Sequence, residues 1–190
     1  WPTRPAPHHG ATGSWAAGYP GNDDAVTIKE DIGGGYIVLA TTDNSQKTSD
    51  LQSLNNILLV KIDLQGNFNQ QRIIGGVAEE NAADIEVLDD GYLVVSTNGT
   101  EASGQSAYVW ELQRNIFEEP VYEHAITIES SSGSAVSFSI HSIARYKTSY
   151  FVMAGQAGSG SSSRMIVFIT DDEGNLLPGK QVIFGSTGSQ

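Results

Sequence analysis

The chain contains no cysteine, which excludes disulfides, thiolate metal ligands and cysteine nucleophiles. Basic side chains are also scarce: 10 Lys and Arg stand against 22 Asp and Glu, and the formal net charge is −12. Because nucleic acids and anionic lipid surfaces are recognised by clustered positive charge, this composition argues against both as partners. No apolar run approaches the roughly 20 residues that a membrane-spanning helix needs. The sequence therefore predicts neither a nucleic-acid partner nor a membrane span.

Proline is scarce outside the first part of the chain, where four of the six prolines precede residue 21. Proline fixes φ and lacks a backbone N–H group, so we expect residues 1–24 to form an irregular N-terminal arm. From residue 25 onward apolar and polar residues alternate in short runs, and no run has a helical period. Residues 25–190 are therefore predicted to form a single all-β repeat domain.

A short apolar strand that follows a polar turn recurs three times. It opens at Tyr36 in Gly-Gly-Tyr-Ile-Val-Leu, at Tyr92 in Asp-Gly-Tyr-Leu-Val-Val, and at Tyr150 in Ser-Tyr-Phe-Val-Met-Ala. These tyrosines lie 56 and 58 residues apart. Such a period is typical of propeller blades or solenoid units, because one small sheet cannot bury its own faces and has to stack on a neighbour.

Each repeat contains four predicted strands, and the repeats cover about residues 25–76, 77–127 and 128–186. The predicted first strands are residues 26–29, 84–87 and 138–144, and the predicted fourth strands are residues 69–74, 121–126 and 180–184. Hairpin turns precede the fourth strands at residues 63–67 and 171–175, where Asp can accept hydrogen bonds from backbone amides and Gly tolerates a positive φ.

The sequence therefore predicts an all-β fold of three four-stranded propeller-type blades. Closed propellers contain about four to eight blades. Three blades predict a partial propeller, a propeller completed by other copies of the chain, or an open stack. The alternative is a β-sandwich of about twelve strands.

A likeness to a known family rests on GGGYIVLATT at residues 33–42, ILLVKI at residues 57–62, DLQGN at residues 63–67 and the glycines at positions 75 and 76. This run resembles the repeats of secreted, propeller-like proteins of the Bacteroidetes type, and the likeness extends over about residues 14–186. It implies export to the surface or the outside of a bacterial cell, and repeats that bring no catalytic residues. The chain departs from the family at residues 72–74 and 182–184, where the family has an aromatic residue before its closing glycines.

Few side chains suggest chemistry. His8 and His9 lie in the proline-rich arm without the fixed geometry of a metal site, and His124 and His141 are predicted to be hydrogen-bonded sheet residues. Acidic pairs occur at residues 23–24, 79–80, 89–90, 118–119 and 171–173. Most lie at turns, where backbone bonding explains Asp better than the paired carboxylates of a glycoside hydrolase do. We assign no catalytic, metal-binding or cofactor-binding residue.

These features favour a non-enzymatic, exported scaffold or binding module that acts through its loops or by self-association. The loops expected to meet a protein or glycan ligand are residues 41–56, 97–107 and 156–164. The open edges of the first and last blades are expected to recruit more sheet. If they do, removal of residues 1–24 should change the oligomeric state.

Two alternatives stay open. A carbohydrate-active or glycan-binding propeller fragment would gather acidic residues on the propeller axis and use Trp15, Tyr19 and Trp110 to stack on sugars. Packing between blades is nevertheless the more expected role of Trp110. A structural subunit of a filament or surface assembly would instead polymerise through the unpaired edges.

Overall fold

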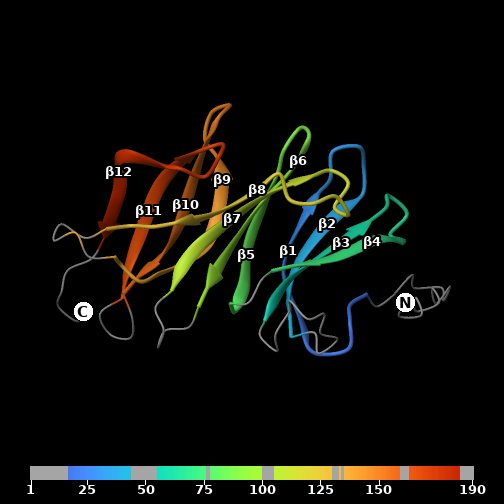
Figure 1. Ribbon diagram of the computed structural model, residues 1–190. Coiled ribbons are helices and arrows are strands. Elements are labelled where there is room, and N and C mark those ends of the chain that lie inside the picture. Colours follow the sequence, from blue (N-terminus) through green and yellow to red (C-terminus); the bar gives the residue numbers. More distant parts are fainter. Residues whose placement is uncertain are drawn as a thin grey trace.

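A computed structural model describes residues 17–43, 55–75, 78–99, 105–129, 133, 135–158 and 163–184. These residues form twelve strands in three four-stranded antiparallel sheets (Figure 1). No helix occurs within these ranges, and so none that is long and apolar enough to cross a bilayer.

Each sheet consists of four strands that are consecutive in the chain, and we call the three sheets blades 1, 2 and 3. Blade 1 contains β1 (Asp23–Glu30), β2 (Tyr36–Thr42), β3 (Asn56–Ile62) and β4 (Phe68–Ile74). Blade 2 contains β5 (Glu80–Val87), β6 (Gly91–Asn98), β7 (Ser106–Gln113) and β8 (Tyr122–Ile126). Blade 3 contains β9 (Phe138–Arg145), β10 (Tyr150–Ala157), β11 (Arg164–Asp171) and β12 (Leu176–Phe184).

The predicted fold of three four-stranded blades is confirmed. The twelve strands divide into three sheets, not into the two sheets of a sandwich, and the three sheets do not close into a ring. β1 begins at Asp23, inside the predicted arm, and residues 1–16 of that arm lie outside the described residues.

Two strands, β5 and β12, begin four residues earlier than predicted. β5 begins at Glu80 and not at residue 84, and β12 begins at Leu176 and not at residue 180. β12 contains Pro178 and Gly179, which the sequence pattern reads as a break. An edge strand tolerates them because only one of its sides has to form ladder hydrogen bonds.

The structural repeat differs by one residue from the repeat of tyrosines. Strand register places Tyr36 and Tyr92 opposite the last residues of β1 and β5, and the residue in that position of blade 3 is Phe151, opposite Arg145. Phe151 and Tyr92 are buried, whereas Tyr150 is exposed. The third repeat thus places phenylalanine at the aromatic position, with the tyrosine one residue earlier, at the start of β10.

The first strand of every blade contains a β-bulge at the same register position. The extra residues are Val26 in β1, Ala83 in β5 and His141 in β9. A bulge bends its strand and increases the local twist. The three bulged strands are also neighbours, since β5 contacts both β1 and β9.

The blades stack face to face, and the core lies between them. Alternate residues of β6 point to opposite sides of blade 2: Tyr92 and Val94 pack against blade 1, and Leu93 and Val95 pack against blade 3. This explains why every residue of β6 is buried. The middle blade is buried on two faces, while each end blade has one face with no blade against it.

Candidate functional site

A buried carboxylate joins blades 1 and 2. Asp31 follows β1, and its side chain bonds three groups: Lys61 Nζ at 3.0 Å, Arg114 at 2.5 Å and the Tyr92 hydroxyl at 2.8 Å. The Lys61 ammonium and the Arg114 guanidinium also lie over the Tyr92 ring, 5.3 and 5.6 Å from its centroid. Burial, followed by the hydrogen bond to Asp31, raises the pKa of the Tyr92 phenol. We call these four residues the Asp31 cluster.

Arg114 extends the Asp31 cluster into the backbone of both blades. Its guanidinium donates to the carbonyls of Leu88 at 2.7 Å and Asp89 at 3.0 Å in blade 2, and of Ile32 at 3.1 Å in blade 1. The Lys61 ammonium donates to the Arg114 carbonyl at 3.1 Å. The buried charges therefore have partners throughout, as charges away from water must. The cluster connects the turn that follows β1 to the turn that follows β5.

A second carboxylate joins blades 2 and 3. Asp84, next to the bulge of β5, accepts hydrogen bonds from the Ser142 hydroxyl and the Ile143 amide of β9, both at 3.1 Å. Its other oxygen accepts from the Ile85 amide at 2.9 Å and lies 3.4 Å from Lys29 Nζ of blade 1. One side chain thus contacts all three blades.

Threonine hydroxyls repeat one contact at both interfaces. Thr41 Oγ1 accepts from the Ala82 amide at 3.0 Å, and Thr97 Oγ1 accepts from the Ile140 amide at 2.9 Å. Thr41 and Thr97 occupy the same position in β2 and β6. Each hydroxyl accepts a hydrogen bond from a backbone N–H group of the next blade. That N–H group lies beside the bulge of the next blade, where the hydrogen bonds between strands are interrupted.

An acidic group lies where β7 meets the last hairpin of blade 3. The Tyr122 hydroxyl donates to the Asp172 carbonyl. Burial raises the pKa of the Glu111 carboxyl, and the carboxylates of Asp90, Asp172 and Glu173 raise it further. Glu111 is therefore held between the two blades among charges of its own sign. No three acidic or histidine side chains of the described residues are arranged to hold a metal ion.

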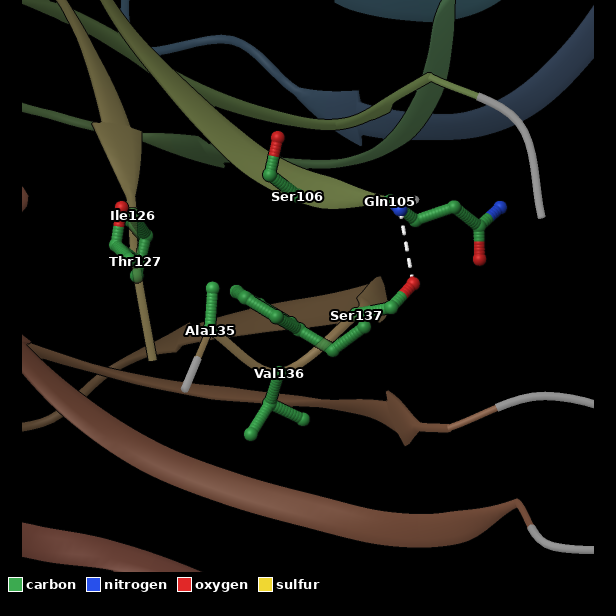
Figure 2. A pocket seen from close by; sticks show the side chains of 8 residues that line it. Gln105, Ser106, Ile126, Thr127, Ala135, Val136 and Ser137 are labelled. Atoms are coloured by element: carbon green, nitrogen blue, oxygen red, sulfur yellow. Dashed lines mark hydrogen bonds between the residues drawn. The ribbon is translucent and has the colours of Figure 1, made fainter. Parts of the chain in front are cut away.

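A cavity of about 260 Å³ lies between β7, the end of β8 and the segment that enters β9 (Figure 2). Its lining consists of Gln105, Ser106, Ile126, Thr127, Ala135, Val136, Ser137 and Phe138. The Ser137 hydroxyl accepts the Gln105 amide at 2.9 Å across it. The lining is mainly apolar and carries no ionisable side chain, and the volume lies just under the roughly 300 Å³ at which ligand pockets begin.

The two ends of the stack differ. On the outward face of blade 1, Ala40, Leu58 and Val60 are buried, and Ala17 and Tyr19 pack against them. Gln71 Nε2 donates to the carbonyl of the intervening Gly18 at 3.3 Å. The chain therefore covers part of this end with its own residues, while Ile28 and Tyr36 of the same face are 56% and 43% exposed.

Within the part of the chain that the structure describes, no segment packs on the outward face of blade 3. Apolar alternate residues of β10, β11 and β12 point away from blade 2 and belong to none of the core clusters, with the polar Gln156 and Asp171 on the same side: Tyr150, Val152, Ala154, Met165, Val167, Ile169, Val182 and Phe184. We call these residues the blade 3 face. Met165, Val182 and Phe184 are 53%, 50% and 46% exposed.

The residues considered from the sequence fall in several places. Trp110 is buried between blades 1 and 2 and offers no free ring for a sugar, and Tyr19 is half-buried against the outward face of blade 1. His141 is the exposed bulge residue of β9, 3.2 Å from Ser139 Oγ, and His124 lies in β8. Asp171 bonds the amides of its own turn, as the sequence predicts. His8, His9 and Trp15 lie outside the described residues.

Sequence reasoning missed the residues that join the blades. Three signals could have revealed them: Lys61 is the only charge in an otherwise apolar strand, Asp84 occupies a first strand, and Arg114 is the only Lys or Arg in the second repeat. None of these signals names a partner, because the partners are distant in the chain. Asp31 and Arg114 are 83 residues apart.

Comparison with known proteins names no family: no protein-family model matches the chain, and no curated protein matches its sequence. The geometry of the blades therefore carries the functional proposal.

Proposed function

We propose that this protein is a non-enzymatic scaffold and binding module that acts outside a bacterial cell. The observation that carries the proposal is the use of four charged side chains at the blade junctions. Asp31, Lys61, Arg114 and Asp84 all bond across the junctions between blades, where they fix the stack. Side chains held in this way serve rigidity, which a scaffold needs.

The loops that join the second strand of each blade to its third are the proposed ligand surface. The connections β2–β3, β6–β7 and β10–β11 are equivalent in the three blades. The last residues of the first two connections are hydrogen-bonded to the first strand of the next blade. The Glu80 amide donates to the Asn55 carbonyl at 2.9 Å, and the Phe138 amide donates to the Gln105 carbonyl at 3.0 Å. A rigid base that presents variable loops is a common arrangement for binding.

The rival function is a carbohydrate-active enzyme, and its best acid–base pair is Asp84 with Glu86 on β5. Burial raises the pKa of Glu86, as a catalytic acid would require, although the nearby Arg145 and Lys29 charges lower it in part. Asp84 itself, however, is held by two donors from β9 and by Ile85. A carboxylate with its oxygens engaged in this way lacks the free lone pair that a nucleophile or base uses.

A panel of chromogenic glycosides tests the scaffold proposal against this rival. We expect no turnover above the buffer blank. Hydrolysis that disappears in both Asp84→Asn and Glu86→Gln would overturn the proposal, provided that both variants keep the far-UV and near-UV circular dichroism of the parent.

A glycan array and loop replacement test the binding surface. Ligand binding should be lost when residues 100–104 are replaced by a Gly/Ser sequence of equal length, while the melting temperature stays unchanged. An equal replacement at residues 130–132, in a segment outside the three loops, is the control.

A further inference from the structure

We propose that the blade 3 face docks against the same face of a second copy of this chain and forms a twofold-symmetric dimer. The inference rests on the proposed scaffold function and names one partner for it. Two sheets would then pack about 10 Å apart, as in a β-sandwich shared between copies.

The blade 3 face occupies the position at which the other two blades are covered. Strand register aligns Val152, Ala154 and Val167 with residues that blade 1 and blade 2 bury against the next blade. Those residues are Ile37, Leu39 and Leu59 in blade 1 and Leu93, Val95 and Val109 in blade 2, all fully buried. The repeat thus builds a stacking face three times, and two of the three are occupied.

The exposed members of the blade 3 face form a continuous patch. Met165 pairs with Phe184 across β11 and β12, and Val182 is the next outward residue of β12. Single exposed apolar residues are ordinary on protein surfaces, whereas contiguous ones mark an interaction site.

The partly covered end of the stack decides how many copies meet. Ala17 and Tyr19 already lie on the outward face of blade 1. A stack with two open faces would add copies head to tail into a ring or a filament. Because Ala17 and Tyr19 already occupy part of the blade 1 face, a stack of this kind joins its twin through blade 3 and not head to tail.

The charge distribution favours a second copy at this end. Twelve of the 22 acidic residues lie between positions 77 and 134, where Arg114 is the only Lys or Arg. From position 135 onward the charged residues are Arg145, Lys147, Arg164, Lys180, Asp171, Asp172 and Glu173. Two copies with a charge of −12 each therefore repel each other least when they meet through blade 3.

Sedimentation velocity across 1–200 µM tests the dimer. We expect a single species with twice the 20.2 kDa mass of the chain at the upper concentrations. Val182→Glu should raise the dimer dissociation constant by at least about 100-fold, because each dimer then buries two unpaired charges. Val121→Glu is the matched control: Val121 is as exposed as Val182, at 56% and 50%, and lies in blade 2.

Circular dichroism on every variant separates a failure to fold from a failure to dimerise.

A monomer at every concentration would overturn the inference, and so would mass that keeps growing beyond the dimer, which is the mark of head-to-tail addition. A dimer that Val182→Glu leaves intact would overturn it as well. None of these results tests the scaffold proposal, because the glycoside panel tests that proposal separately.

Discussion

A single carboxylate, Asp31, balances two cations and a phenol at the junction of blades 1 and 2. Its side chain is 6% exposed, and that of Lys61 is 13% exposed. At this depth the Lys61 ammonium cannot readily exchange a lost partner for water, whereas the Arg114 side chain is 30% exposed. The junction therefore depends on the charge of Asp31 more than on its shape.

Asp31→Asn is expected to lower the free energy of unfolding by about 3 kcal/mol, since it leaves Lys61 and Arg114 facing a neutral amide. Tyr92→Phe removes only one hydrogen bond and should lower it by about 1 kcal/mol. Urea unfolding followed by circular dichroism measures both. Equal losses in the two variants would contradict a role for the carboxylate charge.

Glu111→Gln is expected to stabilise the protein at neutral pH. Because folding raises the pKa of this carboxyl, the native state binds its proton more tightly than the unfolded chain does. That contribution is fully present below the unfolded pKa of about 4.3 and is lost as the pH rises through the folded pKa. The variant cannot ionise and escapes this loss.

Melting temperatures of Glu111→Gln and the parent should therefore differ at pH 7 and converge near pH 3.5. Glu123→Gln removes the same charge from the exposed side of the neighbouring strand and serves as the control. A larger gain from Glu123→Gln than from Glu111→Gln would mean that net charge, and not burial, sets the effect.

At the scale of the strands, local pattern was enough to predict most of the fold. Polar turns and short apolar runs predict twelve strands, because hairpin turns and two-residue alternation depend on residues that are adjacent in the sequence. The sequence did not predict the first half of β5, because Asn81, Ala82 and Ala83 show no apolar alternation. Contact with blade 1, and not local propensity, holds these residues extended. The junctions between blades were not predictable, since each joins residues that tens of positions separate.

The threonines of β2 and β6 act at this scale, because each satisfies a backbone amide of the next blade. Thr97→Val keeps the shape of the side chain but leaves the buried Ile140 amide without its acceptor, which should cost about 2 kcal/mol. Amide hydrogen exchange should show faster exchange in β9 than in β10. Thr97→Ser retains the hydroxyl and should restore most of the protection; a serine variant as weak as the valine variant would assign the effect to packing.

At the scale of the whole molecule, negative charge is concentrated in the middle blade. Some of these acidic side chains, such as Asp84, are buried at the junctions, and the exposed ones gather along the turns and the outer strand of blade 2. Mutual repulsion among like charges destabilises a compact state, and salt screens it over a Debye length of about 10 Å at 0.1 M.

Raising NaCl from 0.05 to 0.5 M should therefore raise the melting temperature at a protein concentration too low for association. Glu123→Gln combined with Glu129→Gln, both exposed positions of this blade, should reduce the dependence on salt. A melting temperature that falls with salt would show that ion pairs such as Lys29–Asp84 outweigh the repulsion.

The order of the strands has a consequence for how the chain reaches this structure. Every sheet is made from four strands that follow one another in the sequence, and none borrows a strand from elsewhere. Low contact order of this kind shortens the search for native pairings. Blade 1 can complete its ladder while the rest of the polypeptide is still emerging, and each later blade then finds a finished surface to condense on. The chain is suited to vectorial folding, from its first blade to its last.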